Sequence, residues 1–179
     1  MAERLERLER AEEAVSAEIP DWSREKPQRV WDPGRKLLRT IRRYQYWRGK
    51  RGVIPFCLCK LLVLRHGFWS AVSGAEIGLN STIGGGLLIP HPNGIVIHPQ
   101  AKIGVNCLIL QQVTIGVGFG PGVAVIGGHV DISAGAKIIG PVEIGDHALI
   151  GANTVVITNV PAGATALGVP ARILPKLPR

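Results

Sequence analysis

Aromatic residues are scarce in this chain and almost vanish from its second part. The 179 residues include nine aromatic ones, of which eight precede residue 75 and the ninth is Phe119. A fold too narrow to enclose rings must build its core from aliphatic side chains alone. We therefore expect two parts of different construction, divided near Ala75.

Cysteines are few, long apolar runs are lacking, and no export signal is expected. Three cysteines are an odd number and indicate a reducing cytoplasm. Residues 1–19 are charged and helix-like, so we expect no signal peptide. The longest apolar run, residues 53–69, contains Pro55, Lys60 and Arg65 and falls short of the roughly 18 residues of a membrane span. Cys57 and Cys59 form a CxC pair without a completing cluster, so we expect plain buried thiols and no metal.

Acidic residues are nearly missing where the cations gather. Residues 24–65 contain 13 Lys or Arg against 2 Asp or Glu, whereas residues 76–173 contain 3 against 4. The formal net charge of +8 therefore belongs to the first third of the chain. This basic run lacks a recognised nucleic-acid-binding motif, so we expect no nucleic acid among the partners.

What the second part does contain is an aliphatic residue at every sixth position. These are Ile77, Ile83, Ile89, Ile97, Ile103, Ile109, Ile115, Ile126, Ile132, Ile138, Ile144, Ile150 and Val156. In most repeats a small or β-branched residue stands four positions later: Ser81, Ala101, Cys107, Val113, Val130, Ala136, Val142, Ala148, Thr154 and Val160. Period six fits neither an α-helix nor an alternating strand.

This period is the signature of a parallel β-helix. Each hexapeptide forms a short strand and a turn, three of them make a triangular coil, and the aliphatic residue points into the prism. A β-sandwich would need alternation and hairpin turns instead. We expect a mainly β fold with a β-helix over residues 76–173, an N-terminal helical, basic region over 1–75 and a short tail over 174–179.

The repeat is interrupted twice. Two extra residues follow Ile89, within Pro90-His91-Pro92-Asn93-Gly94, and an eleven-residue step separates Ile115 from Ile126. Loops that leave the wall of a solenoid are where function concentrates. Because the repeat itself needs no histidine between two prolines, His91 is the first candidate functional residue.

Taken together, these segments resemble the serine acetyltransferase branch of the hexapeptide acyltransferases. The resemblance covers roughly residues 74–173 and rests on "AEIG", "HPNGIVI", "QQVTIG", "AGAKIIGPVEIG", "IGANTVV" and "GVPARIL", in the family's order. It implies a left-handed parallel β-helix, an exception to the usual right-handed crossover. It also implies a homotrimer with active sites between subunits, acetyl-CoA as the donor, and direct attack by a hydroxyl without an acyl-enzyme.

The resemblance assigns catalysis to His91 and Glu76. His91 stands at the place of the family's catalytic histidine, and Glu76, fifteen residues earlier, at that of its orienting carboxylate. Fifteen residues is nearly one coil, which permits contact between neighbouring coils. A neutral imidazole would take the proton of the attacking hydroxyl, and the carboxylate would fix its tautomer. The alternative is a surface histidine and a solvated carboxylate.

For acetyl-CoA the family uses backbone groups of the coils and a few side chains. The corresponding residues are Thr114, Gly116, Ala134, Gly135, Lys137, Gly151, Ala152 and Arg172. The small residues also serve the prism itself. Lys137 and Arg172 are either phosphate-binding cations or solvated charges.

At the acceptor site the sequence departs from serine acetyltransferases. Pro90 replaces the aspartate that precedes the catalytic histidine, and Gly122-Val123 stand where the family has an Arg-His pair. Because an uncharged rim compensates a zwitterion poorly, we expect a saccharide acceptor of the capsule or exopolysaccharide kind, held by Pro90, Asn93 and Phe119. We thus expect the chain to be closer to polysaccharide O-acetyltransferases than to true serine acetyltransferases. The alternatives are a serine O-acetyltransferase of cysteine synthesis and a non-catalytic scaffold.

The remaining histidines are expected to be structural or solvent-exposed: His66, His98, His129 and His147. His129 follows the longer interruption, so it is a weaker candidate for touching the substrate.

In the N-terminal region we expect a charged helix over residues 3–18 and a linker over 20–34. A basic amphipathic helix follows from Asp32-Pro33, and after it an apolar segment over 55–69. Residues 24–65 therefore suit either a peripheral contact with the inner face of a membrane or simple packing on the trimer with their arginines in solvent. The expected location is the cytoplasm.

Overall fold

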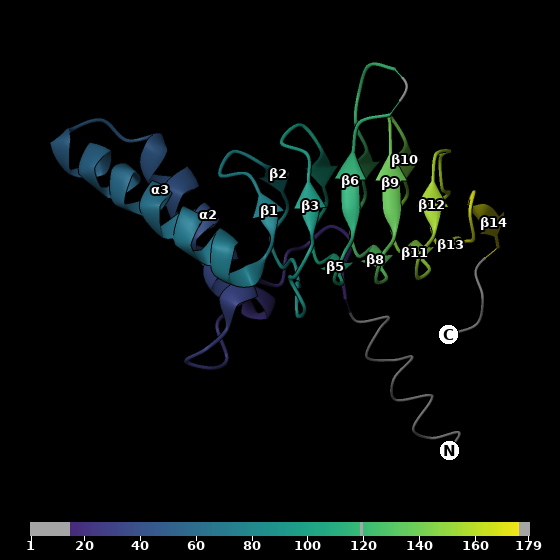
Figure 1. Ribbon diagram of the computed structural model, residues 1–179, viewed down its shortest axis with the longest axis horizontal. Helices are drawn as coiled ribbons and strands as arrows, with labels where there is room; N and C mark the ends of the chain where they lie inside the picture. Colours follow the sequence, from purple (N-terminus) through teal and green to yellow (C-terminus); the bar gives the residue numbers. More distant parts are fainter. Residues whose placement is uncertain (1–14, 119, 176–179) are drawn as a thin grey trace.

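A triangular prism of stacked coils, with two helices at its first end, makes up the protein (Figure 1). The computed structural model describes residues 15–118 and 120–175. The expected left-handed parallel β-helix with an N-terminal helical region is confirmed. The charged helix expected over residues 3–18 lies mostly outside the described residues.

Three sheets form the walls of the prism. Sheet A contains β1 (Glu76–Ile77), β3 (Val96–Ile97), β6 (Thr114–Gly116), β9 (Lys137–Ile139) and β12 (Val155–Val156). Sheet B contains β2 (Thr82–Ile83), β4 (Lys102–Ile103), β7 (Val125–Ile126) and β10 (Glu143–Ile144). Sheet C contains β5 (Leu108–Ile109), β8 (Asp131–Ile132), β11 (Leu149–Ile150), β13 (Thr165–Leu167) and β14 (Arg172–Leu174). All pairings are parallel except that of β13 with β14.

The hexapeptide pattern places the aliphatic residues in register. In sheet A, Ile77 pairs with Ile97, Ile97 with Ile115, and Ile115 with Ile138. Every aliphatic residue of the repeat is buried, and so is every small residue four positions later. Coils stack about 4.8 Å apart, which excludes rings from the core and leaves little room at the corners. A Cβ on Gly104 would lie 2.4 Å from the backbone of Gly127 in the next coil.

Helix α2 (Pro33–Arg48) covers the N-terminal end of the prism. As expected, Asp32 caps it by accepting a hydrogen bond from the N–H of Arg35, and Pro33 is its first residue. Its apolar face, formed by Leu37, Leu38 and Ile41, is buried in the same core as the first coils. The amphipathic pattern of this helix therefore reflects packing on the prism.

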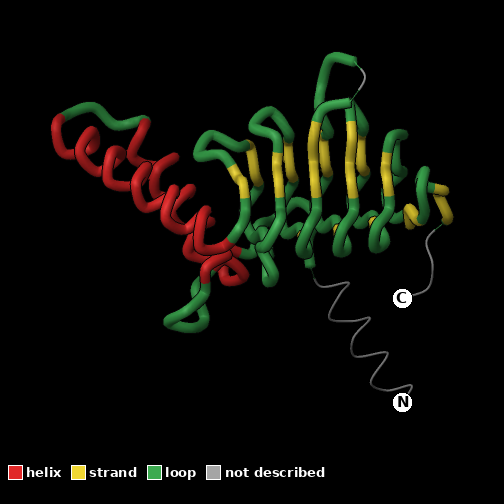
Figure 2. Tube along the Cα trace, viewed as in Figure 1, coloured by secondary structure: helices red, strands yellow, loops and turns green. Residues whose placement is uncertain are grey.

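Helix α3 (Val53–Ser73) runs back along α2 and leads into β1 (Figure 2). Arg65 donates to Thr40 Oγ1 at 3.3 Å, and Lys36 lies over the ring of Trp69, so the two helices pack as a hairpin. Gly74, in the left-handed conformation at φ 66°, ends α3 and turns the chain into the first coil. We call α2 and α3 together the helical hairpin.

The segment expected as a linker, residues 20–34, is packed against the prism instead. It contains the short 3₁₀ helix η1 (Trp22–Glu25), and Glu25 is only 6% exposed. The Glu25 carboxylate accepts from the guanidinium of Arg42 and from the N–H groups of Gly86 and Leu87. Proline and charge content suggested a solvated linker, but the buried ion pair fixes this segment to the first coils.

The two interruptions of the repeat both border sheet A. The first is the turn over residues 90–95, which enters β3, and the second is the loop over residues 117–124, which leaves β6. Strands β3 and β6 are neighbours. In Figure 1 the loop between β6 and β7 rises well above the other turns. The irregular segments thus flank one wall of the prism at adjacent coils.

Candidate active site

The candidate residues gather along sheet A and one of its edges. The chain passes from sheet C to sheet A through turns over residues 90–95, 110–113, 133–136 and 151–154, which stack on one another. We call this edge the C–A corner. Its turns are linked by backbone hydrogen bonds, for example from Gln112 N–H to the Asn93 carbonyl at 2.9 Å. Residues far apart in sequence therefore form one continuous strip parallel to the prism axis.

His91 lies in the first, irregular turn of this strip. Gly94 adopts φ 72°, and its N–H donates to the carbonyl of Gly74 at 2.8 Å. The N–H of Ile95 donates to the carbonyl of Pro92, which closes the turn. Both hydrogen bonds fix the backbone and leave the His91 side chain exposed. The turn therefore presents an imidazole to the outside of the prism.

Glu76 stands in the coil next to this turn. Its N–H donates to the carbonyl of Ile95 at 2.8 Å, and Glu76 pairs in register with Val96. The side chain is exposed on the outer face of sheet A. Among the described residues neither Glu76 nor His91 makes a side-chain hydrogen bond. The structure brings the two onto neighbouring coils, and their pairing stays a prediction.

The residues predicted to bind acetyl-CoA continue the strip away from His91. Thr114 and Lys137 are paired in register on sheet A, and Gly116 follows in β6. Ala134 with Gly135, and Gly151 with Ala152, occupy the next two turns of the C–A corner. From β3 to β12 the strip spans three coil spacings, on the order of 14 Å. The arrangement suits an extended ligand, and the role of each residue remains a prediction.

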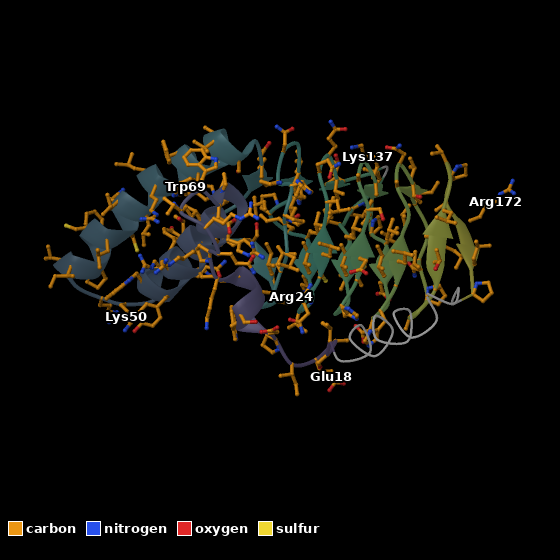
Figure 3. All side chains as sticks on the ribbon, turned by 90° about the horizontal axis from the view of Figure 1, so that it is seen from below. Glu18, Arg24, Lys50, Trp69, Lys137 and Arg172 are labelled. Carbon is orange, nitrogen blue, oxygen red and sulfur yellow. The ribbon has the colours of Figure 1, made fainter. Side chains whose placement is uncertain are left out.

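The two predicted cations lie at different heights on the prism (Figure 3). Lys137 is half-buried, and its Nζ donates to the carbonyl of Gln112 at 2.5 Å. Arg172, on β14, is exposed at the C-terminal end of the prism. The two cations therefore lie on different sheets, and their contact with phosphates stays a prediction.

The residues predicted to hold the acceptor lie beside His91 where the structure describes them. Pro90 is exposed directly before the histidine. Asn93 is exposed, and its side-chain amide nitrogen lies close to Gly74, where a Cβ would be 3.1 Å from it. Phe119 lies outside the described residues.

Two glutamines of the C–A corner were missed in the sequence. Gln112 adopts φ 59° and connects the His91 turn to Lys137, because its N–H donates to Asn93 and its carbonyl accepts from Lys137. The buried amide oxygen Oε1 of Gln111 has no hydrogen-bond partner among the described residues. A buried amide oxygen without a partner can accept a hydrogen bond from a ligand or from another subunit. The double glutamine in "QQVTIG", two and three positions after Ile109, was the available signal.

The other histidines occupy different places. His66 Nε2 lies 2.8 Å from the carbonyl oxygen of Ile77, and His98 Nδ1 accepts from the N–H of Gln100. His129 is buried, with its Nδ1 2.8 Å from Nδ1 of His147 one coil away. Both stand between sheets B and C, at another corner from His91, so the structure does not favour the suggested contact of His129 with substrate.

No cluster of three or more metal-ligating side chains occurs within residues 15–118 and 120–175. All three cysteines are free, but the burial expected for Cys57 and Cys59 is wrong, because Cys57 is exposed and Cys59 only half-buried. Cys107 is buried. Burial raises the pKa of the Cys107 thiol to about 12, which keeps it protonated and unreactive at neutral pH.

No family model matches the chain. It is similar to the serine acetyltransferase of Haemophilus influenzae, at 46% identity over 111 residues that cover 59% of this chain and 40% of that protein. Among solved structures it is similar to soybean serine acetyltransferase complexed with serine, with TM-score 0.67 and 34% identity over 79% of this chain and 57% of that one. A serine acetyltransferase in complex with CoA matches with TM-score 0.66 and 33% identity, over 81% of this chain and 58% of that one.

These similarities show that the chain has the fold of hexapeptide-repeat acyltransferases of the serine acetyltransferase type. The chain spans about half the length of the curated relatives it matches, from 36% to 63%. The structural similarity extends over 79% to 83% of this chain.

The prediction from the sequence that the acceptor is a saccharide is wrong. Relatives at 37–46% identity and the structural neighbours are serine acetyltransferases, and none of those compared supports a closer relation to polysaccharide O-acetyltransferases. The expectation rested on two missing charged positions, at Pro90 and at Gly122-Val123. A carboxylate can also be held by backbone N–H groups or by a neighbouring subunit, so two substitutions do not exclude a zwitterion.

Proposed function

We propose that this protein transfers the acetyl group of acetyl-CoA to the hydroxyl of L-serine. The observation that carries the proposal is the strip formed by His91, the C–A corner and sheet A. The fold that presents this strip is similar to structures of serine acetyltransferases in complex with serine and with CoA. The irregular turn presents His91 at one end of the strip, and the residues proposed for acetyl-CoA continue from it.

In the proposed reaction His91 acts as the general base. As the serine oxygen attacks the thioester carbonyl carbon, the imidazole takes the hydroxyl proton, which contributes roughly 10² to 10⁴ in rate. The tetrahedral intermediate collapses with cleavage of the carbon–sulfur bond, and the imidazolium returns the proton to the CoA sulfur. The products are O-acetylserine and CoA, and no acyl-enzyme forms.

Glu76 is proposed as the group that orients the imidazole. Its backbone hydrogen bond to Ile95 fixes β1 beside the turn that contains His91. A carboxylate on the second ring nitrogen favours the tautomer that accepts a proton and stabilises the imidazolium.

The proposed acetyl-CoA site follows the C–A corner. Small residues at Gly135 and Gly151 let a pantetheine arm approach the backbone, and Lys137 faces the same strip as a cation for a phosphate. Arg172 would meet a phosphate only at the far end of the strip. Acetyl-CoA supplies the activated acyl group, and the chain supplies the base and the alignment.

The proposed assembly is a homotrimer with its sites between subunits, in the cytoplasm where acetyl-CoA is available. The exposed positions of His91 and Glu76 and the unpartnered Gln111 oxygen are consistent with a site that a second subunit completes. Membrane contact is a separate proposal, since it depends on residues of the helical hairpin.

The test is serine-dependent release of the CoA thiol from acetyl-CoA by the full chain. We expect robust release with L-serine, little without an acceptor, and little with L-serine methyl ester, which lacks the carboxylate. Release that does not depend on L-serine, from folded protein shown to bind CoA, would contradict the proposal. Retention of full serine-dependent release in His91→Ala would remove His91 from the mechanism.

A further inference from the structure

The outward face of α3 is an extended apolar surface. The side chains that form it are Val53, Ile54, Phe56, Leu61, Val63, Leu64, Phe68 and Val72, which are between 37% and 78% exposed. Lys60 is the one charged residue on this face within the described chain. Soluble proteins rarely expose a contiguous apolar patch of this kind unless it binds a partner.

The opposite face of α3 is held in place. Leu62 and Trp69 are buried against α2, while Arg65 bonds to Thr40 and His66 contacts the Ile77 carbonyl. These contacts attach α3 to α2 and to the first coil. The outward side chains are therefore presented by a rigid support.

Cations without acidic partners surround this surface. Residues 33–75 contain no Asp or Glu, and within the described chain only Arg35 and Arg42 of their ten Lys and Arg residues form ion pairs with a carboxylate. On α2 the exposed residues Arg39 and Arg43 share one side, because they are four positions apart. Lys50 and Arg51 lie at the tip of the helical hairpin, where α3 begins.

We propose that α3 binds the surface of a membrane rich in anionic lipids, with its outward apolar face in the interfacial region and the hairpin cations at the headgroups. An interfacial helix buries its apolar face about 5–10 Å deep, and long basic side chains reach the phosphates from there. The sequence suggested residues 24–65 as the contact through a basic amphipathic helix. In the structure the apolar face of α2 is buried against the prism, so the helix available to insert side chains into the membrane is α3.

A second copy of this chain fits the surface less well than an anionic membrane. Pairing two such faces would bring unpaired cations from both copies together, with no carboxylate on either hairpin to compensate. The expectation that the apolar run is too short for a membrane span is wrong by length, because α3 continues it to Ser73. Within the described chain, α3 alone is long and apolar enough to cross a bilayer, a property that core helices of soluble proteins share. Because one side of α3 is held on the protein, through buried Leu62 and Trp69 and the hydrogen bond of Arg65 to Thr40, α3 lies on the membrane and does not span it.

The experiment is flotation of the full chain in a density gradient. The vesicles contain phosphatidylcholine alone or phosphatidylcholine with 30% phosphatidylglycerol. We expect the protein to float with the anionic vesicles, to float far less with the neutral ones, and to stay at the bottom without vesicles. Absence from the anionic vesicle fraction would overturn the proposal.

Two variants separate the apolar and electrostatic contributions. Leu61→Glu/Leu64→Glu places charges on the outward face, and Lys50→Glu/Arg51→Glu reverses the cations at the tip. Each should lower the membrane partition coefficient by roughly tenfold or more. Ile157→Glu is the matched control, since Ile157 is an exposed aliphatic residue on the prism, 55% exposed, and should bind like the wild type.

Light scattering and circular dichroism accompany each variant. If Leu61→Glu/Leu64→Glu stays folded but lowers the molecular mass, and the wild type does not float, the face joins copies of this chain and the membrane proposal is wrong. If both variants float like the wild type, binding does not occur through α3. Flotation needs no catalysis, so failure of this inference and failure of the proposed function are distinguishable.

Discussion

The Nε2 of His66 in α3 lies 2.8 Å from the carbonyl oxygen of Ile77 in β1. Ile77 directly follows Glu76, the candidate carboxylate of the site. One contact therefore joins the exposed apolar helix to the strand that borders the His91 turn. The proposed membrane surface and the proposed catalytic strip are adjacent parts of one rigid structure.

Replacement of His91 should remove the general base. His91→Ala is expected to lower kcat/KM for serine-dependent CoA release by roughly 10² to 10⁴, without loss of CoA binding. His147→Ala is the control, because His147 lies between sheets B and C at another corner of the prism. Thiol release and equilibrium binding of CoA provide the two measurements. An equal loss in both variants would point to a general effect on the fold.

Replacement of Glu76 should affect turnover more than binding. Glu76→Gln keeps the shape of the side chain but removes the charge that would orient the imidazole, so kcat should fall roughly tenfold or more while the KM for acetyl-CoA stays constant. Glu143→Gln, at an exposed strand position of sheet B, should behave as the wild type. A Glu76→Gln enzyme with unchanged kcat would exclude this carboxylate from the site.

The ion pair of Glu25 and Arg42 should dominate the stability of the N-terminal attachment. Arg42 Nη2 lies 2.8 Å from Glu25 Oε1, and the guanidinium also donates to the carbonyls of Ile83 and Gly84. Arg42→Ala leaves a buried carboxylate with fewer donors and should lower the free energy of unfolding by about 3 kcal/mol. Arg43→Ala, one residue away and exposed, should change it by no more than about 0.5 kcal/mol. Urea denaturation measures both.

Cys107 should make stability fall at alkaline pH. Burial raises the pKa of the Cys107 thiol from 9.0 to about 12. The contribution of the buried neutral thiol to the free energy of unfolding is therefore complete below pH 9 and is lost as the pH rises towards 12. Above pH 9 the unfolded thiol ionises while the native one stays protonated, which costs up to about 1.4 kcal/mol per pH unit. The difference in unfolding free energy between the wild type and Cys107→Ala should therefore shrink between pH 9 and 10.

The matched control for this titration is Cys57→Ala. Cys57 is exposed, so its replacement should leave the pH dependence unchanged. A constant difference between the wild type and Cys107→Ala across this pH range would show that the Cys107 thiol does not titrate differently in the two states.

The prism follows from local sequence alone. Isoleucine at every sixth position, as in Ile97, Ile103 and Ile109, decides which side chain of each coil points inward, because the conformation of each hexapeptide repeats locally. The same periodicity located the His91 turn as an irregularity, and Asp32-Pro33 located the start of α2.

The roles of the polar and apolar residues outside the repeat depend on long-range packing. Glu25 is buried because Arg42 and two N–H groups 61 and 62 residues away converge on it, which no local pattern reveals. The sequence of α3 is apolar around most of its circumference, so its pattern could not tell the face that packs on α2 from the face that is exposed. Local periodicity fixes conformation, whereas burial of a charge or exposure of an apolar face depends on which distant segments pack against it.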